Sequence, residues 1–288
     1  MRGALAATFA LFLVLSGCAK TERELVTPAL WEVTGPAGEQ GWLFGTIHAL
    51  PAPVAWRSEK IEAALAGSDR LVLEIDNADD PAALAEVFTR LSRTHGQPSV
   101  EQRVPAASRA QLESLLKKHG LAGQRFDDVE TWAVAITLSQ AAAKDMDSRH
   151  GIDREIMQAA GDKPVAELEG AETQLRIFDA LPEKEQADLL AGVVHDAGDD
   201  TMQDRLGTAW KSGDMAAIEA ETQGGLLADP ELRAALLVDR NVKWADTVAA
   251  MLKNGARPLV AVGAAHMAGP EGLPALLEAR GFTVTRIQ

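Results

Sequence analysis

Two short segments near opposite ends of the chain share one pattern, and this repetition is the strongest constraint that the sequence places on the fold. In "GWLFGTIHAL" an apolar stretch ends at Gly45 and is followed three residues later by His48. In "PLVAVGAAHMAGP" the same order recurs with Gly263 and His266. Each apolar stretch predicts a β-strand. Each glycine suits a turn at the strand end, because glycine adopts positive φ angles and permits close approach.

Each of these strands begins a larger unit of strand, helix and strand. After the first motif, "SEKIEAALAG" predicts a helix with Ser58 as its N-cap and Gly67 at its end, and "DRLVLEID" predicts a buried strand. After the second motif, "EGLPALLEARG" predicts a helix and "FTVTRI" a strand. We therefore expect residues 41–76 and 258–287 to form two related βαβ-type units with parallel strands and right-handed crossovers.

The segment between the two units is predicted to be largely helical, from about residue 80 to residue 255. Its longest helix has Asp229 as the predicted N-cap. Another helix is expected to begin with a capping box formed by Ser108 and Gln111. A short strand is expected at residues 164–168. These elements surround the two terminal units without an obvious linker.

The predicted fold class follows from this order of elements. Residues 30–34 and 42–45 form a hairpin that joins the first unit. The chain is therefore expected to be an α/β protein with a central mixed sheet. Two related βαβ-type units at the chain ends build this sheet, and a large helical middle segment lies between them. We expect one domain spanning residues 30–288.

A candidate site is expected at one edge of this sheet. In open α/β sheets, ligands bind outside the carboxyl ends of the parallel strands. Gly45 and Gly263 end their strands, so His48 and His266 are expected at that edge. Glu74 lies near the carboxyl end of the strand "LVLEID" and belongs to the same edge.

The chemistry of these three side chains leaves more than one interpretation open. Two imidazoles and a carboxylate suit a divalent transition metal, which activates water and polarises a carbonyl group in hydrolases. In a metal-free version, Glu74 orients one histidine, which acts as a general base. A purely structural alternative pairs Glu74 with Arg70 or with an inserted helix, because an unpaired buried carboxylate is costly.

The charge of the chain argues against one class of partner. The formal net charge is −14 at pH 7, and no cluster of basic residues is apparent in the sequence. Binding to a phosphate backbone requires such clusters of lysine and arginine. We therefore expect no nucleic-acid partner.

The N-terminus has the features of a bacterial lipoprotein signal. Residues 1–17 contain one arginine and then an apolar run that is short for a membrane span and typical of a signal peptide. The run ends in "LSGC", which resembles the lipobox, and Cys18 is the only cysteine in the chain. We expect cleavage before Cys18, lipidation of Cys18, and a tether of residues 18–29. Ala19 favours sorting to the outer membrane, so the protein is expected to face the periplasm from a lipid anchor.

The motifs together resemble a known family. "LFGTIH" and "VAVGAAH", with "LVLEID" between them, resemble the TraB/GumN family, which is related to the Tiki proteins. That family is marked by two Gly-x-x-His motifs and a glutamate in an early strand. The stretches "HGIDREIM", "VAELEGAETQL" and "DRNVKW" are similar to further family segments. The resemblance covers residues 30–288.

This resemblance implies an α/β fold of two related halves in which the histidine motifs meet. For the Tiki branch it also implies a metal-dependent peptidase that uses Mn or Co. Three positions match the family's motif residues, namely His48, Glu74 and His266. Four weaker matches are implied to support them, namely Asp153, Glu169, Arg240 and Asn241.

The leading expectation is therefore a cell-envelope hydrolase that depends on a divalent metal, with Mn or Co as the first metals to consider. Its substrate is expected to be a peptide or another small molecule, with peptides as the leading class. Two alternatives stand beside it. One is a metal-free esterase that uses the same histidines and Glu74. The other is a lipoprotein that binds a metal ion or haem without turnover.

Overall fold

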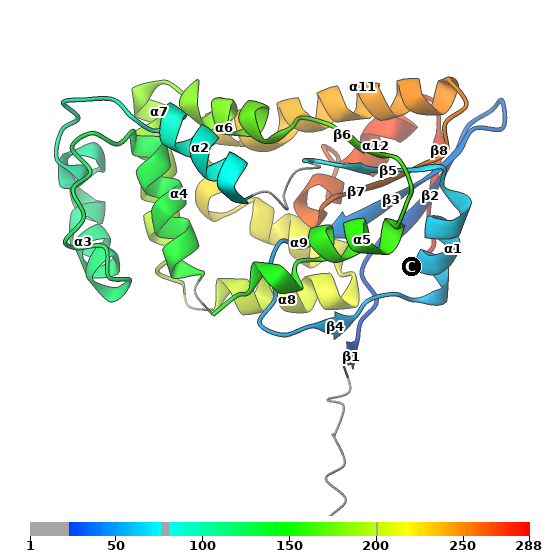
Figure 1. The fold of residues 1–288 in the computed structure, drawn as a ribbon, viewed down its shortest axis with the longest axis horizontal. Helices are drawn as coiled ribbons and strands as arrows, with labels where there is room; N and C mark the ends of the chain where they lie inside the picture. Colours follow the sequence, from blue (N-terminus) through cyan, green and yellow to red (C-terminus); the bar gives the residue numbers. More distant parts are fainter. Residues whose placement is uncertain (1–22, 76–80, 144, 200) are drawn as a thin grey trace, which may run out of the picture.

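The computed structural model describes residues 23–75, 81–143, 145–199 and 201–288. Its centre is a six-stranded sheet with the order β6–β5–β7–β3–β2–β8 (Figure 1). Strands β6, β5, β7 and β3 pair in parallel, and β2 pairs antiparallel with both β3 and β8. The predicted α/β class with a mixed sheet is confirmed. The strands are β2 (Leu30–Thr34), β3 (Gln40–Thr46), β5 (Arg70–Leu73), β6 (Val165–Glu167), β7 (Pro258–Gly263) and β8 (Thr283–Arg286).

The two Gly-x-x-His motifs begin on neighbouring strands at the centre of this sheet. β3 and β7 pair in parallel, with Gly45 opposite Val262 and Thr46 opposite Gly263. β7 also pairs with β5, so it lies between the two strands of the first predicted unit. The strands of that unit are parallel as expected, but they are not adjacent. The two units are therefore interleaved, and this brings both motifs to one sheet edge.

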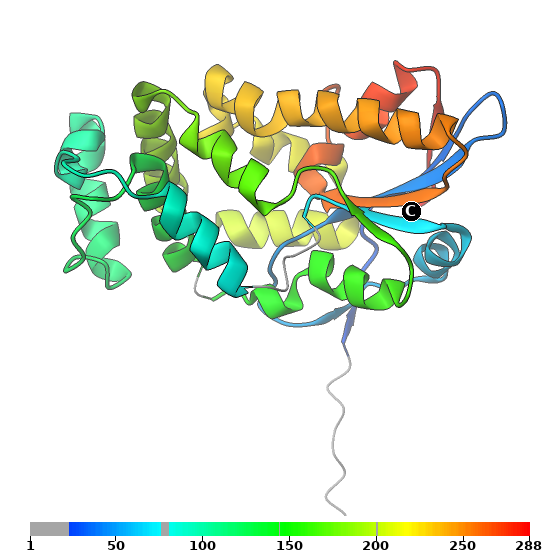
Figure 2. The same ribbon diagram turned by 45° about the horizontal axis from the view of Figure 1, so that its top comes forward.

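Helices cover both faces of the sheet, as Figures 1 and 2 show. The strands alternate between two cores, because successive side chains of a strand point to opposite faces. Trp42 and Phe44 pack in one core, and Leu43 packs in the other. The first core is covered by α1 (Glu59–Gly67), α5 (Ile152–Ala160) and α8 (Met202–Ser212). The second core is covered by α11 (Asp239–Lys253) and α12 (Leu273–Glu278).

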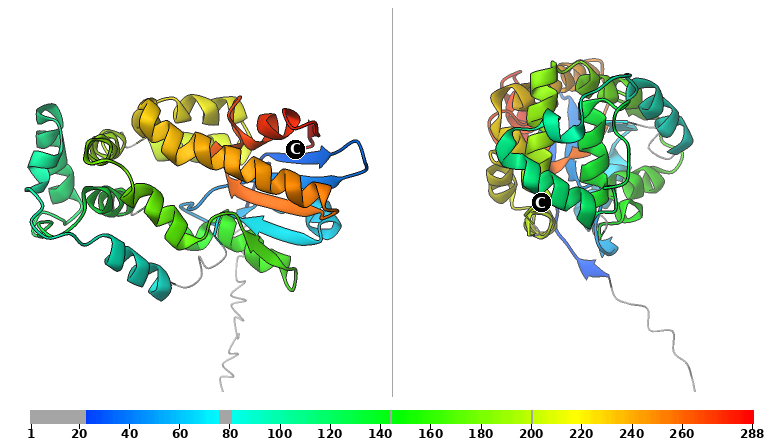
Figure 3. Two further views of the ribbon diagram at one scale, coloured as in Figure 1. Left: turned by 90° about the horizontal axis from the view of Figure 1, so that it is seen from above. Right: turned by 90° about the vertical axis from the view of Figure 1, so that its left-hand side faces the viewer.

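A third core holds the helical middle segment together. Leu112, Trp132, Leu138 and Leu190 are fully buried there, away from the sheet. Figure 3 shows these helices lying to one side of the sheet, on the side toward which β3, β5 and β7 run. The predicted helical middle is therefore confirmed. Besides α5, α8 and α11, the segment contains α2 (Pro81–Leu91), α3 (Arg109–Lys118), α4 (Thr131–Ala142), α6 (Ala171–Asp179), α7 (Glu183–Asp196), α9 (Met215–Thr222) and α10 (Pro230–Arg233).

One predicted helix start is wrong in its detail. A 3₁₀ turn of Ala106–Ser108 leads directly into α3, so Ser108 has helical backbone angles of φ −91° and ψ −8°. An N-cap residue needs an extended backbone to turn its hydroxyl toward the helix. The Ser108 side chain accordingly makes no capping bond. Gln111 donates from Nε2 to the Val194 carbonyl at 2.9 Å instead of closing a capping box.

The long C-terminal helix is capped as predicted but is not uniform. The Asp229 carboxylate accepts a hydrogen bond from the Leu232 backbone amide at 3.0 Å. A π-helical turn of Ala234–Val238 then separates α10 from α11. Such turns interrupt the regular backbone hydrogen bonds and occur frequently at functional sites. Asp239 alone separates this turn from Arg240.

The folded part of the chain begins earlier than predicted. Strand β1 (Glu24–Leu25) pairs in parallel with β4 (Val54–Ala55), and Val26 and Ala29 are buried. Residues 24–29 therefore belong to the folded domain and not to the predicted tether, because they include a paired strand and buried side chains. The predicted signal peptide of residues 1–17 and Cys18 lie outside the described residues. No helix within the described ranges is long and apolar enough to cross a membrane.

Candidate functional site

The three residues predicted from the motifs meet around the Cα atom of Gly263. A Cβ atom built on Gly263 would lie 3.4 Å from Glu74 Oε1, 3.6 Å from His48 Nε2 and 3.8 Å from His266 Cδ2. The backbone amide of Gly263 also donates to Glu74 Oε1 at 2.8 Å. The space in front of Gly263 is thus shared by two imidazoles and one carboxylate.

The two motif glycines serve close approach and not an unusual backbone angle. Gly263 has φ −48° and ψ 135°, which any residue adopts, and Gly45 does not have a positive φ. The expectation of a positive φ at these positions is therefore wrong. At Gly45 an added Cβ would lie 3.2 Å from the Ala264 Cβ, because Ala264, the residue after Gly263 in the second motif, packs against Gly45.

His48 lies at the mouth of the site and is held by a carboxylate. Its Nδ1 lies 2.7 Å from Asp153 Oδ2, and the Thr46 hydroxyl donates to the other oxygen of Asp153. The His48 side chain is 73% exposed. The charge of Asp153 raises the pKa of His48 above its usual value of 6.5. Asp153 thus fixes the proton on Nδ1 and leaves Nε2 of the neutral ring as an acceptor beside Gly263.

His266 has the opposite environment. It is buried in a 3₁₀ turn (Ala264–Met267), with a ring centroid 4.5 Å from that of Trp244. The hydrogen-bond network assigns a proton to Nδ1, which donates to Asn241 Oδ1 at 2.6 Å. Nε2 accepts from Arg240 Nη1 at 3.3 Å. Burial lowers the pKa of His266 to about 4, and the charge of Arg240 adds to this effect. His266 is therefore neutral at pH 7.

Arg240 joins the buried groups into one network. Its guanidinium donates to Glu169 at 2.9 and 3.0 Å, to Glu74 Oε2 at 3.2 Å and to His266 Nε2. Nη1 also donates at 3.0 Å to the carbonyl of Leu236, which lies in the π-helical turn. All five N–H groups of the guanidinium thus have partners inside the protein. Arg240 acts as a fixed cation in the wall of the site.

Glu74 is ionised because this network compensates for its burial. Burial raises the pKa of a carboxyl group. The neighbouring imidazoles of His266 and His48, the Arg240 guanidinium and the Gly263 amide together outweigh burial and lower the pKa of Glu74. The alternative pairing with Arg70 is wrong, because Arg70 donates to Asp69. The other alternative, a partner of Glu74 on an inserted helix, corresponds to Arg240 of α11.

The four residues that were only weakly indicated all lie in this site. Asp153 holds His48, Asn241 holds His266, and Glu169 holds Arg240. Two further partners, Thr46 and Gln174, were not singled out, although both lie inside the quoted stretches "LFGTIH" and "VAELEGAETQL". Thr46 donates to Asp153, and Gln174 of α6 donates to Glu74 Oε2 at 3.3 Å. Thr46 stands inside "FGTIH", so its position beside His48 was a local signal that could have found it.

The arrangement of these donors determines whether they can hold a metal ion. Each imidazole is held at Nδ1 by a side-chain oxygen, which is how proteins orient metal-binding histidines. However, Arg240 already donates to both His266 Nε2 and Glu74 Oε2. Among the described residues, no group of three or more histidine, cysteine or acidic side chains is arranged to hold a metal. The residues in this arrangement do not fit a three-ligand metal centre.

Fold and site together describe an α/β protein with paired histidine motifs at the carboxyl edge of its sheet. The model of the TraB/PrgY/gumN family matches residues 29–286, so the chain belongs to this family.

Similar proteins in other organisms carry no assigned function. The chain is 28% identical to the uncharacterized protein YbaP of Shigella flexneri and to that of Escherichia coli K12. Each match covers 87% of this chain and 92% of the relative. An uncharacterized protein of Treponema pallidum is 24% identical over 84% of this chain and 78% of its own length. No solved structure matches significantly.

Proposed function

We propose that this protein is a hydrolase in which His48 acts as the general base. The observation that carries the proposal is the contact between His48 Nδ1 and Asp153 at 2.7 Å. This contact leaves Nε2 facing the space in front of Gly263, which it shares with Glu74 and His266. A histidine oriented by a carboxylate, with its other nitrogen free, is a common arrangement for proton transfer.

The proposed chemistry assigns a role to each side of this space. Neutral His48 takes the proton of a water molecule that attacks a carbonyl carbon, and Asp153 stabilises the imidazolium that forms. The same imidazolium then donates the proton to the leaving group. Glu74 and His266 form the opposite wall of this space and are held there by hydrogen bonds inside the protein. Arg240 keeps both in place.

This assignment sets the direction of the pH dependence. Because Asp153 raises the pKa of His48 to about 10, the neutral base becomes populated progressively as the pH rises from 6.5 toward 10. The value of kcat/KM is therefore expected to increase with pH in this range. In Asp153→Asn the rise is expected at lower pH, because the stabilising charge has been removed.

A metal-dependent hydrolase is the second candidate. It is supported by the two imidazoles, each held at Nδ1 by a side-chain oxygen. Binding of an ion by His266 Nε2 would require Arg240 Nη1 to leave that nitrogen. Mn and Co are the first ions to test.

The proposed location and substrates follow from the sequence. A lipid on Cys18 would anchor the protein to the outer membrane, with the site in the periplasm. Peptides are the first substrate class to test, and carboxylic esters are the second. A lipoprotein that binds a metal ion or haem without turnover is the outcome if neither class is cleaved.

A single experiment separates these candidates. The purified protein is assayed against peptide and ester panels with chelator, without chelator, and after addition of Mn or Co. Cleavage that resists the chelator and is lost in His48→Ala supports the general-base mechanism. Cleavage that requires the metal supports the second candidate.

The chain offers a matched control for His48→Ala. His195 is 76% exposed and lies 3.1 Å from Asp196, so it resembles the His48–Asp153 pair in exposure and charge. It lies on α7, away from the sheet edge. His195→Ala is expected to retain full activity. Equal losses in the two variants would contradict the assignment of His48.

A further inference from the structure

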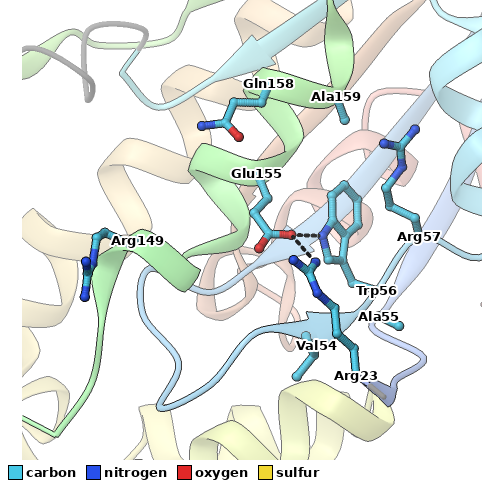
Figure 4. A pocket seen from close by; sticks show the side chains of 9 residues that line it. All are labelled: Arg23, Val54, Ala55, Trp56, Arg57, Arg149, Glu155, Gln158 and Ala159. Carbon is cyan, nitrogen blue, oxygen red and sulfur yellow. Dashed lines mark hydrogen bonds and ion pairs between the residues drawn. The ribbon is translucent and has the colours of Figure 1, made fainter. Parts of the chain in front are cut away.

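A cavity on another part of the molecule is lined by three arginines that the proposed reaction does not use. Its volume is about 480 Å³, and Arg23, Arg57 and Arg149 surround it together with Trp56, Glu155 and Gln158 (Figure 4). Arg23 is the first described residue, Arg57 lies between β4 and α1, and Arg149 lies in the turn before α5. None of them belongs to the site around Gly263.

The arginines retain donors for an anion although carboxylates lie beside them. Arg57 contacts Glu62, and Arg149 contacts Asp147, in each case through Nε and Nη2. Within the described part of the chain, Nη1 of both arginines makes no hydrogen bond. The Arg23 guanidinium is 3.9 Å from Glu155, which is longer than a strong contact.

The arginine side chains also extend into solvent, being between 49% and 80% exposed. Arginine binds phosphate oxygens through its planar fork. The cavity is therefore suited to a phosphate group.

The position of this cavity places it next to the expected lipid anchor. Four residues separate Cys18 from Arg23, so the two Cα atoms are at most about 18 Å apart even in a fully extended chain. Strand β1 then fixes Glu24 and Leu25 against β4, which forms part of the cavity wall. A lipid on Cys18 would thus hold this face at the bilayer surface.

An exposed apolar side chain lies on the same face. Leu25 is 87% exposed, although it lies in a strand whose backbone is fixed. Apolar side chains beside basic ones are characteristic of surfaces that rest in the lipid headgroup region. Figure 1 shows β1 and β4 on one side of the molecule and α11 on the opposite side.

We propose that the face formed by β1, β4 and the start of α5 rests on the membrane. Leu25 enters the interface, and the arginine cavity binds the phosphate of an anionic phospholipid. The binding rests on the remaining guanidinium donors and not on a net positive charge, because each arginine lies beside a carboxylate and the chain carries a net charge of −14. The inference rests on the lipid anchor proposed above and does not depend on the hydrolase chemistry.

The test measures where labelled positions lie relative to the bilayer. Cys18 is the only natural cysteine and would be lipidated, so one introduced cysteine accepts a spin label uniquely. The lipidated full-length product is reconstituted in vesicles of phosphatidylethanolamine and phosphatidylglycerol, or of phosphatidylcholine alone. Collisions of each label with oxygen and with a water-soluble nickel complex report its depth.

The informative label position is 158, because Gln158 is exposed, lines the cavity and lies far from the anchor along the chain. In the phosphatidylglycerol vesicles, labels in Leu25→Cys and Gln158→Cys are expected to be several-fold better protected from nickel than the label in Val242→Cys. Val242 is the matched control, since it is 40% exposed on the opposite helix α11.

A charge-removing variant separates docking from simple proximity. Arg57→Gln with Arg149→Gln is expected to reduce protection at position 158 to the level at position 242, while the melting temperature stays unchanged. Loss of protection in phosphatidylcholine vesicles would identify the anionic headgroup as the partner.

Three results would overturn the inference. Equal accessibility at positions 158 and 242 in both vesicles would do so, as would full protection in the double variant. Failure of Cys18 to incorporate a labelled fatty acid would remove its basis. None of these measurements involves turnover, so a failure here is distinguishable from a failure of the hydrolase proposal.

Discussion

The two histidine motifs start from the same local sequence pattern and end in opposite chemical states. His48 is largely exposed, contacts the Asp153 carboxylate and has a raised pKa. His266 is 7% exposed, contacts Asn241 and Arg240, and has a pKa lowered to about 4. The repeated motif therefore places the two histidines at the sheet edge, and the residues contributed by the neighbouring helices make their pKa values different.

The largest expected effect comes from the cation that holds the buried side. Arg240→Met leaves the carboxylates of Glu74 and Glu169 without their partner, and both are buried. Removal of one member of a buried ionic network costs about 3–5 kcal/mol. Chemical denaturation is expected to show a loss of this size. Arg176→Met is the control, because its pair with Glu172 is exposed to solvent and contributes little to stability. Equal losses would contradict the central role of Arg240.

The next effect concerns the space that the two histidines share. In Gly263→Ala the new Cβ makes only ordinary contacts, and the backbone angles suit alanine, so the fold is expected to be retained. The methyl group occupies the space between His48 and Glu74, where the proposed water would lie. A loss of activity of about 10²-fold or more is expected, as for removal of a general base. Activity assays and melting curves on one preparation test both statements.

The equivalent glycine of the first motif is expected to behave differently. In Gly45→Ala the new Cβ lies 3.2 Å from the Ala264 Cβ and 3.3 Å from its Cα. Overpacking of this kind costs about 1–3 kcal/mol. Gly45→Ala is therefore expected to lower stability more than Gly263→Ala does. The opposite order of stability would show that the two glycines have been assigned the wrong roles.

A further comparison changes the charge of the partner that holds each histidine. Asp153→Asn is expected to lower the pKa of His48 toward 6.5, and Asn241→Asp is expected to raise the pKa of His266 from about 4. Each change alters the partner charge with little change in shape. NMR titration of the two imidazoles measures both shifts. Unchanged values would mean that the partners do not determine the protonation states.

The first of these variants also has a signed effect on stability. A raised pKa in the folded state means that the His48–Asp153 pair contributes stability below pH 6.5 and loses it as the pH rises through the folded pKa. The difference between the wild type and Asp153→Asn is therefore expected to be largest near pH 5–6 and to vanish at high pH. Because His48 is largely exposed, the difference is expected to stay below about 1 kcal/mol. Denaturation across this pH range measures it.

Much of the fold could be predicted from local patterns. The hairpin, the helix after Ser58, the strand at residues 164–168 and the Asp229 cap are all confirmed, because each depends on a few consecutive residues. The interleaving of β7 between β3 and β5 could not be predicted, because strand order depends on contacts between distant segments. The capping box at Ser108 failed because a preceding turn changed its backbone angles.

Some residues of the candidate site could likewise be predicted from local sequence, and others could not. His48, His266 and Glu74 were found from their places at strand ends, since parallel strands bring their carboxyl ends to one edge. Asp153, Glu169, Arg240 and Asn241 were indicated only by the family resemblance. Gln174 was missed because it lies 100 residues from Glu74 and meets it only through the packing of α6.

The sequence by itself determined which reactive side chains stand at the edge of the sheet. Strand ends and turn residues are local properties, so two Gly-x-x-His motifs and one glutamate were visible without a structure. Only the tertiary structure decided the charge and orientation of these side chains. Asp153 reaches His48 across 105 positions and Arg240 reaches Glu74 across 166. Protonation depends on burial and on neighbouring charges, and neither property exists until the helices have packed against the sheet.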